Sequence, residues 1–395
     1  MSQVAQPMHE PEGSLPPDLA ELLRQMLESD ASDLHITAGV PPQVRVDGSL
    51  QGMDYAALDE RTTQSLLYSV MTDEQKAKFE ENLECDFSFG LEGMARFRAN
   101  VFMQRGSVAG ALRVIPWRIP SFDELKLPAI LRDLCEKPRG MVLVTGPTGS
   151  GKSTTLAAMV DVINETHSDH IITIEDPIEY LHAHKKSIVN QRELGQDTRA
   201  FSAAMRSALR EDPDVVLIGE MRDLESTELA LKLAETGHLT FGTLHTNGAV
   251  QTINRIIDQF PEGQQGQIRT QLSFVLEAAV SQTLLPHRSG KGRVLVQEIL
   301  VPNAAIRNLI REDKIHQIYS SMQSGQAEHG MKTFNQDLVR LVMERQITVE
   351  TAMSASPDKK EIVATLERSG PVRGQAPAAR ASNSGRRFKR TSGRR

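Results

Sequence analysis

The feature that most constrains this chain is a glycine-rich octapeptide set between an apolar strand and an apolar helix. Residues 146–153 read Gly-Pro-Thr-Gly-Ser-Gly-Lys-Ser, directly after the apolar run 141–145 and just before the helical run 155–163. Glycines allow a turn whose backbone N–H groups converge on phosphate oxygens, reinforced by the positive end of the following helix. The alternative is a glycine-rich turn with an accidental lysine, and the strand before and the helix after argue against it. We therefore expect a P-loop.

A P-loop predicts binding of a nucleoside triphosphate together with Mg²⁺. Its lysine pairs with the β and γ phosphates and its serine hydroxyl ligates the metal, which are the roles expected of Lys152 and Ser153. The nucleotide contacts are expected from Gly146, Pro147, Thr148, Gly149, Ser150, Gly151, Lys152, Ser153 and Thr154.

Hydrolysis needs more than a P-loop, because a water must be oriented and a metal held. Two acidic strand ends are candidates, namely residues 174–179 (Ile-Glu-Asp-Pro-Ile-Glu) and Glu220 after the apolar run 215–218. A doubly wound sheet has its ligand crevice at the carboxyl ends of its strands, so Glu220 is expected to act on Mg²⁺ or its waters. Either cluster alone is equally compatible with a solvated strand end, and a P-loop in the same sheet favours catalysis.

Two histidines flank the apolar strand 239–244. His245 closes this strand and is expected to reach the crevice, while His238 precedes it. A lone histidine is more often structural than functional. Because these two flank one strand of a nucleotide sheet, we hypothesise that they sense phosphate or couple its loss to motion.

The front of the chain has the pattern of a small α+β unit. Residues 1–17 are polar and rich in proline, and we expect them to be disordered. Residues 18–115 are expected to form helices on an antiparallel sheet. The helices are indicated by apolar side chains at helical spacing over 19–27 and by a capping box at Thr72 and Gln75. The sheet is indicated by an Asp47-Gly48 turn and by alternating strands between 86 and 115.

Beyond a proline-containing linker at 116–121 the pattern becomes that of an α/β sheet covered on both faces. Apolar strands alternate with helices through residues 122–302, and the strands are expected at 141–145, 170–174, 214–218, 239–244 and 293–301. A helical region over 303–369 and a tail over 370–395, rich in Gly, Ser, Ala and Arg and expected to be disordered, complete the chain.

Composition excludes several classes. No run of 18 apolar residues is present, so no membrane-spanning helix is expected, and the polar start is not a secretory signal. Cys85 and Cys135 are too few for a disulfide framework or a four-cysteine zinc site. The whole chain carries −6 and its last 25 residues carry +8, so the rest carries −14. An acidic body argues against tracking along nucleic acid, which needs a basic channel.

Four segments together resemble the nucleotide-site boxes of the secretion-superfamily ATPases. GPTGSGKST (146–154), TIEDPIEY (173–180), LREDPDVVLIGEMRD (209–223) and AETGHLTFGTLHT (234–246) are similar to the Walker A, Asp, Walker B and His boxes. More narrowly, the chain resembles the type IV pilus retraction ATPases, the PilT and PilU family. SDLHITAGVPPQVRVDG (32–48) and AIRNLIRE (305–312) extend the resemblance to roughly residues 18–365.

The resemblance implies a RecA-like ATPase domain, a smaller N-terminal PAS-like α+β domain and a helical C-terminal region. It implies that Glu179 polarises the attacking water, that Glu220 is the Walker B carboxylate and that His238 and His245 form the His box. It also implies a homohexameric ring in which arginines of the N-terminal domain complete an ATP site. The matching residues are Arg96, Arg98, Arg105 and Arg113, for which the alternative is ordinary surface charge.

For the whole protein the resemblance implies a cytoplasmic motor, peripheral at the inner membrane, that hydrolyses ATP to retract pili in twitching motility. Its implied partners are the membrane platform protein and a paralogous retraction ATPase. The P-loop, residues 220–223 and residues 243–246 favour the PilT branch, whereas the extended C-terminus is similar to the PilU branch. A ring translocase on nucleic acid and a non-hydrolysing scaffold are the alternatives from other classes.

Two further segments have uncertain roles on sequence grounds. In AIRNLIRE, Ile306 and Ile310, like Arg307 and Arg311, are four residues apart and predict adjacent apolar and basic stripes on one helix. The basic stripe is expected to be exposed, either for coupling to retraction or as part of a packing helix at a subunit contact. The tail has basic residues around Phe388 and is either a solubilising extension or a contact for anionic lipid or nucleic acid.

Overall fold

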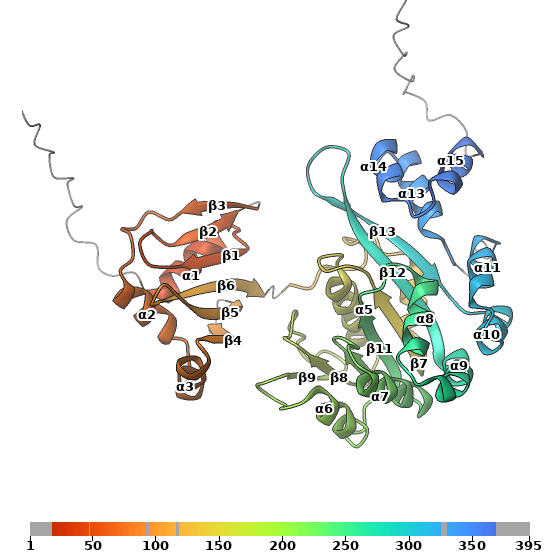
Figure 1. Ribbon diagram of the computed structural model, residues 1–395, viewed down its shortest axis with the longest axis horizontal. Coiled ribbons are helices and arrows are strands. Elements are labelled where there is room, and N and C mark those ends of the chain that lie inside the picture. Colours follow the sequence, from red (N-terminus) through yellow and green to blue (C-terminus); the bar gives the residue numbers. More distant parts are fainter. Residues whose placement is uncertain (1–17, 47, 92–94, 116–117, 325–329, 369–395) are drawn as a thin grey trace, which may run out of the picture. The chain divides into compact units, whose positions relative to one another are not determined.

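A computed structural model describes residues 18–46, 48–91, 95–115, 118–324 and 330–368 (Figure 1). The two ends that the sequence predicts to be disordered, residues 1–17 and 370–395, lie outside this range, as do Asp47 of the expected turn and residues 116–117 of the expected linker. No helix within the described ranges is long and apolar enough to cross a membrane. By contacts the chain divides into two compact units, residues 1–284 with 295–333, and residues 285–294 with 334–395.

The front of the first unit is a six-stranded antiparallel sheet packed with three helices. The strand order is β3-β2-β1-β6-β5-β4. The strands are β1 (Asp33–Ile36), β2 (Gln43–Val46), β3 (Ser49–Gly52), β4 (Glu84–Leu91), β5 (Ala95–Gln104) and β6 (Ser107–Ile115), and the helices are α1 (Leu19–Glu28), α2 (Glu60–Tyr68) and α3 (Asp73–Asn82). Their apolar side chains form one core, which includes Leu23, Leu67, Phe79 and Phe97. The expected capping box of Thr72 and Gln75 is present at the start of α3.

A seven-stranded sheet with the order β13-β12-β7-β11-β10-β8-β9 forms the centre of the fold. Five neighbouring pairs of strands run parallel, namely β12 with β7, β7 with β11, β11 with β10, β10 with β8, and β8 with β9. The strands are β7 (Gly140–Thr145), β8 (His170–Glu175), β9 (Ile188–Glu193), β10 (Val215–Ile218), β11 (Leu239–Leu244), β12 (Leu276–Pro286) and β13 (Arg293–Leu300).

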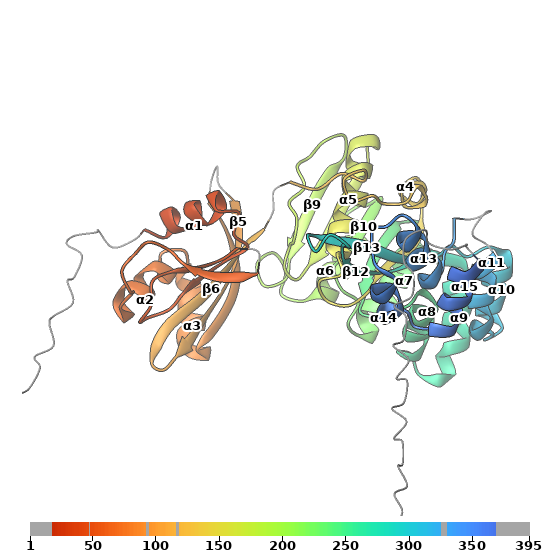
Figure 2. The ribbon, with the colours of Figure 1, turned by 90° about the horizontal axis from the view of Figure 1, so that it is seen from above.

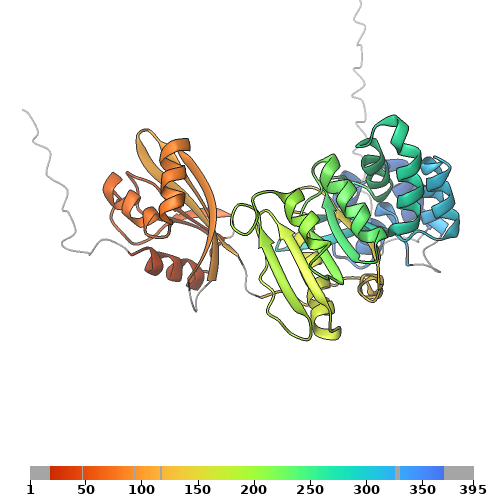
Figure 3. The same ribbon diagram turned by 90° about the horizontal axis from the view of Figure 1, so that it is seen from below.

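Both faces of this sheet are covered, as the near-continuous apolar strands predict. In β7 the side chains of Met141 and Leu143 join one apolar cluster, while those of Val142 and Val144 join another on the opposite face. Besides α1, α2 and α3, the first unit contains these helices (Figure 2 and Figure 3): α4 (Ala129–Cys135), α5 (Lys152–Thr166), α6 (Phe201–Ala208), α7 (Leu224–Glu235), α8 (Ala249–Asp258), α9 (Glu262–Val275), α10 (Ala304–Arg311), the 3₁₀ turn η1 (Ile315–Gln317) and α11 (Ile318–Ser324). The expected α/β fold class is confirmed.

Two strands of this sheet escape the sequence patterns. β9 has polar residues at its last four positions, 190–193, and is the outermost strand on one side of the sheet, so it lacks the apolar run of its neighbours. β12 begins at Leu276, directly after α9 ends at Val275, with no glycine or proline between helix and strand. Without a local stop signal, only the pairing of β12 with β7 identifies it as a strand.

The second unit contains the turn between β12 and β13 and the helices α13 (Phe334–Met343), α14 (Val349–Ala355) and α15 (Lys359–Arg368). A hydrogen bond of 2.8 Å from Arg288 N to Gln346 O joins the turn to the helices. The buried amide of Asn335 donates to Asp358 O and to Glu361 Oε2, which ties α13 to the start of α15.

Candidate nucleotide site at the carboxyl edge of the central sheet

The P-loop connects β7 to α5, and its backbone needs glycine. Gly146, Gly149 and Gly151 have φ of 140°, 77° and 86°. A Cβ on Gly146 would lie 2.2 Å from the carbonyl oxygen of Gln282, so no other residue fits there. Gly146 N also donates to Leu244 O at 3.3 Å, which holds the start of the loop against the end of β11.

Gln282 of β12 supports the loop from within the protein, and nothing in the sequence indicated it. Its side chain is buried, its Nε2 donates to Ser150 O at 3.0 Å, and its Oε1 accepts a hydrogen bond of 3.1 Å from Thr155 Oγ1. Gln282 therefore connects the turn of the P-loop to the first turns of α5.

Lys152 is held by the loop itself. Its Nζ donates to the carbonyl oxygens of Gly146 at 2.9 Å and Pro147 at 3.2 Å. Burial lowers the pKa of Lys152, and the nearby carboxylates of Glu220 and Glu179 partly counteract this effect. The two predicted catalytic carboxylates thus act electrostatically on the P-loop lysine.

Glu220 follows β10 and lies between the side chains of Arg222 and His245. Its Oε2 is 2.8 Å from Arg222 Nε, and its Oε1 is 3.2 Å from His245 Nε2. His245 follows β11, so the parallel ends of β10 and β11 bring these residues together. The hydrogen bond with Glu220 raises the pKa of Arg222. The structure thus places Glu220 and His245 at the same edge, as expected, and adds Arg222.

The acidic segment at the end of β8 contains one buried carboxylate, that of Glu175, and two exposed ones, those of Asp176 and Glu179. Glu175 is buried, and burial raises its pKa to about 7 although Thr173 Oγ1 and Gln191 Nε2 donate to it at 2.6 and 3.4 Å. The backbone N–H of Glu179 donates to Glu175 Oε2 at 3.4 Å, and the Glu179 side chain is exposed. Glu175 therefore supports the backbone that carries Glu179.

Tyr180 joins this segment to α5. Its hydroxyl lies 3.0 Å from Thr154 Oγ1, next to Ser153, and its carbonyl oxygen accepts a hydrogen bond of 2.8 Å from Gln191 Nε2. Tyr180 lies within the segment that resembles the Asp box, so the motif was visible in the sequence. The partner of its hydroxyl was not, because 26 residues separate it from Thr154.

His238 lies at the other edge of the sheet. It precedes β11, whose six residues span about 20 Å, and its carbonyl oxygen accepts a hydrogen bond from Gly140 N at the start of β7. Its Nδ1 is 2.9 Å from Leu233 O. The structure does not bring His238 to the P-loop of its own chain. His238 could therefore act on a nucleotide only from the amino edge of the sheet or in the site of a neighbouring subunit.

The four candidate arginines of the front sheet have different environments. Arg98 and Arg113 are exposed and directly opposite each other on β5 and β6, and Arg45 and Asp33 continue the same row on β2 and β1. Arg113 Nε is 2.7 Å from Asp33 Oδ1. Burial raises the pKa of Asp33, but hydrogen bonds from Ser32 and Arg113 more than offset it, so the pKa is lowered. This arginine row, Arg45, Arg98 and Arg113, is a surface that suits an anion.

Arg96 and Arg105 do not belong to the arginine row. Arg96 Nη2 donates to Glu193 Oε2 at 3.0 Å and to Ser88 Oγ at 2.7 Å, and the same Glu193 oxygen accepts a hydrogen bond of 3.1 Å from Ile178 N. Arg105 is exposed in the turn between β5 and β6.

Helix α10 contains the AIRNLIRE segment and corrects one expectation. Ile306 and Ile310 are buried, as predicted. Arg307, however, donates to the carbonyl oxygens of Ser273 and Phe274 at 2.8 and 3.1 Å and to Glu277 Oε1 at 2.9 Å. It therefore caps the end of α9, whose last carbonyls lack helical partners. The prediction of a fully exposed basic stripe is wrong for Arg307 and holds for Arg311, which lies over the exposed ring of Phe274 at 5.7 Å.

Comparison with known proteins identifies relatives along most of the chain. A family model described as type II/IV secretion system protein matches residues 9–354. The type IV pilus retraction ATPase PilT of Pseudomonas aeruginosa is 50% identical over 335 residues, 85% of this chain and 97% of that protein. The type IV pilus ATPase PilU of the same organism is 43% identical over 345 residues, 87% of this chain and 90% of that protein.

A solved structure has the same fold. The crystal structure of the pilus retraction motor PilT with bound ADP is 57% identical, with a TM-score of 0.84, and the match covers 88% of this chain and 99% of that one. This similarity confirms the fold class expected from the sequence, which is a RecA-like ATPase domain with N-terminal and C-terminal parts.

Proposed function

The chain belongs to the family of type II/IV secretion system proteins, and we propose that it is the ATP-hydrolysing motor of type IV pilus retraction. The observation that carries this proposal is the identity of 50% along 97% of the length of PilT, a protein named as a retraction ATPase. The expected resemblance to the retraction ATPases is confirmed. Because the identity to PilU is 43%, the PilT branch is favoured over the PilU alternative.

The donor set at the carboxyl edge fits a nucleotide with Mg²⁺. Ser153 and Glu220 offer a hydroxyl and a carboxylate, which are the hard oxygen donors that Mg²⁺ prefers. The Glu220 oxygens are already held by Arg222 and His245, so the carboxylate is oriented before any metal arrives. When bound, Mg²⁺ would neutralise charge on the β and γ phosphates.

The chain's own residues account for the remaining needs of hydrolysis. Lys152 leaves the carbonyls of Gly146 and Pro147 and moves to the β and γ phosphates. Glu179, an exposed carboxylate of the segment that resembles the Asp box, orients the attacking water, with its backbone held by Glu175. His245 holds Glu220 and can respond to the loss of the γ phosphate.

We infer that the arginine row completes the site in an assembled ring. Arg98 and Arg113 are exposed and directly opposite each other, and like charges in that position destabilise a sheet. An anionic phosphate would relieve this repulsion. By the family resemblance the assembly is a homohexamer at the cytoplasmic side of the inner membrane, where it works on the platform protein of the pilus machine and beside a paralogous retraction ATPase.

The arginine proposal predicts a loss of turnover without a loss of nucleotide binding. Arg98→Ala should reduce kcat by about 10³-fold, the lower limit for a positioned arginine, while the affinity for ADP and the oligomer size stay unchanged. Arg24→Ala on α1 is the matched control, because it removes an exposed arginine of the same domain that is not among the four candidates. Equal kcat in both variants would remove the arginine row from the site.

The function is tested in cells that carry Glu179→Gln in place of the natural chain. A retraction motor that cannot hydrolyse ATP should leave more surface pili and no twitching. Glu262→Gln, the same chemical change at an exposed position of α9, is the control and should leave both unchanged. Fewer pili in the Glu179→Gln cells would indicate assembly instead of retraction.

A further inference from the structure

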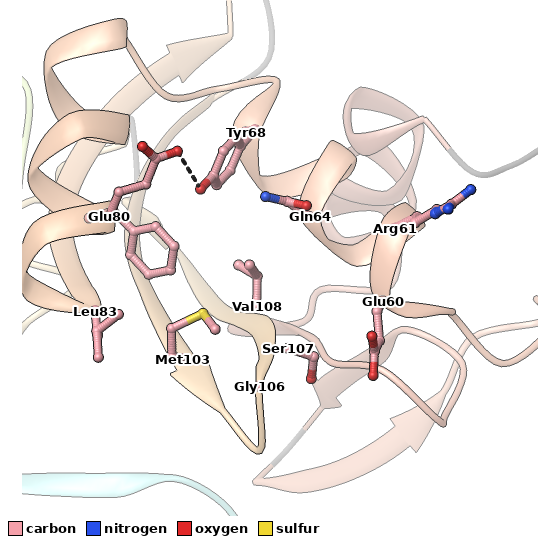
Figure 4. Close-up of a pocket in the computed structure, with 11 residues that line it drawn as sticks. Glu60, Arg61, Gln64, Tyr68, Glu80, Leu83, Met103, Gly106, Ser107 and Val108 are labelled. Carbon is pink, nitrogen blue, oxygen red and sulfur yellow. Dashed lines mark hydrogen bonds between the residues drawn. The ribbon is translucent and has the colours of Figure 1, made fainter.

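A pocket in the N-terminal domain lies outside the proposed nucleotide site (Figure 4). It has a volume of about 360 Å³ and is formed by α2, α3 and the hairpin of β5 and β6. Tyr68, Phe79, Leu83 and Met103 form its apolar part, Glu60 and Glu80 are its acidic members, and Arg61 is its basic member. Pockets of 300–1,000 Å³ are the usual size for burying an anchoring group.

The apolar part of the pocket is preorganised and open to solvent. The Phe79 side chain is buried and meets the Tyr68 ring edge to face, with a centroid distance of 6.1 Å. Leu83, in contrast, is 56% exposed, because it ends α3 in the left-handed conformation, with a φ of 63°. The Tyr68 hydroxyl lies 3.4 Å from Glu80 Oε1 and keeps that carboxylate beside the rings. An exposed leucine beside ordered aromatic rings is suited to bind a further apolar group.

The charge around the pocket is negative. Residues 59–84, which include both helices, contain seven acidic and three basic side chains, a net charge of −4. The chemistry that fits such a site is an apolar anchor flanked by cationic side chains.

The C-terminal tail of the chain has this chemistry. Residues 370–395 contain eight basic and no acidic residues, and their one aromatic residue, Phe388, is flanked by Arg386, Arg387, Lys389 and Arg390. The last described helix ends at Arg368, twenty residues before Phe388. Twenty residues span at most about 70 Å, so the segment can reach a pocket over a long distance.

We propose that the pocket binds the C-terminal tail, with the Phe388 ring against Phe79, Leu83 and Met103 and the flanking basic side chains beside Glu60 and Glu80. Each exposed ion pair contributes less than about 1 kcal/mol. Tethering raises the effective concentration of the tail to the millimolar range, so weak contacts suffice for substantial occupancy. The pocket belongs to the same chain or to a neighbouring subunit. Binding there would keep the basic tail from anionic lipid or nucleic acid.

Photo-crosslinking in the full-length protein tests this proposal. Phe388 is replaced by p-benzoylphenylalanine, the protein is irradiated, and the crosslinked peptides are identified by mass spectrometry. The expected sites are in residues 79–83 and 103, at least fivefold more abundant than with the same probe at Ala381. Crosslinks spread over the surface, or concentrated outside the pocket, would overturn the proposal.

A matched pair of charge changes separates the pocket from general attraction. Glu60→Lys with Glu80→Lys should reduce crosslinking at least fivefold, whereas Glu74→Lys with Glu81→Lys makes the same net change at residues that do not line the pocket and should reduce it less than twofold. Thermal unfolding and size-exclusion elution verify that both variants fold and assemble. An equal reduction by both pairs would contradict specific binding. In a last experiment, vesicles of anionic phospholipid are added before irradiation. If the crosslinks then move from the protein to the lipid, the tail binds membranes and the proposal is overturned.

Discussion

The two edges of the seven-stranded sheet both carry clusters of charged side chains, but the clusters differ in accessibility. At the carboxyl edge, Glu220 is held by Arg222 and His245, whose side chains are 62% and 47% exposed. At the amino edge, Glu277 is held by Arg307 at 2.9 Å and Lys137 at 3.1 Å, whose side chains are 23% and 45% exposed, so the main difference is between Arg222 and Arg307.

The difference shows how one sheet serves binding at one edge and packing at the other. Partners at the carboxyl edge are open to water, so a phosphate or a metal can replace them at small cost. The network at the amino edge also satisfies the last carbonyls of α9, so removing a member leaves partly buried polar groups without partners. The following predictions test this contrast, from the largest expected effect to the smallest.

The largest effect is expected from Lys152→Ala at the carboxyl edge. It removes the P-loop ammonium that is proposed to pair with the phosphates, and steady-state ATP hydrolysis should fall by 10²–10³-fold, roughly the effect of deleting one preorganised donor. Lys137→Ala at the amino edge is the control, because it removes one ion pair of Glu277 and should leave turnover within about twofold. Near-normal hydrolysis by Lys152→Ala would show that the edges do not differ as described.

The second effect concerns stability. Arg307→Ala removes three hydrogen bonds from the end of α9 and from Glu277, and it should lower the free energy of unfolding by about 2 kcal/mol. Arg311→Ala removes an exposed cation–π contact and should cost less than about 1 kcal/mol. Thermal unfolding of both variants measures the difference. If their midpoints agree while only Arg307→Ala abolishes retraction, Arg307 acts in coupling and not in packing.

The third effect is a pH dependence caused by Glu175. Burial raises its pKa to about 7 in the folded protein, above the ordinary value of 4.5 for a glutamate, so its contribution to stability is fully present below pH 4.5 and is lost as the pH rises through 7. Between pH 6 and 8 this loss is about 1.4 kcal/mol. Glu175→Gln, which stays neutral, should lose less stability over the same interval. Parallel pH profiles of the unfolding midpoint for the variant and the natural protein would disprove the assignment.

The smallest effect is expected from Arg222→Ala. Arg222 and a metal compete for Glu220, and an exposed ion pair of this kind is worth about 0.2–1 kcal/mol. The Mg²⁺ concentration for half-maximal hydrolysis should therefore fall by about 1.4- to fivefold. Arg206→Ala, which removes the exposed pair with Glu225 on the adjacent helices, is the control. A raised requirement for Mg²⁺ would mean that Arg222 helps to form the metal site.

Much of the fold could be predicted because its signals are local. The strand before the P-loop, the helix after it, the capping box at Thr72 and the buried face of α10 all follow from spacing within one segment. β12 could not be predicted, because nothing marks its start after α9 and its strand conformation depends on pairing with β7.

The sequence by itself determined the P-loop, the acidic strand ends, the fold class and the family, because each depends on neighbouring residues in a fixed order. Only the tertiary structure decided that Gln282 supports Ser150, that Arg307 caps α9, and that Arg222 pairs with Glu220. These outcomes depend on which distant segments meet and on how far water reaches between them. A side chain's partners across the fold, and not its type, decide whether its charge is available to a ligand.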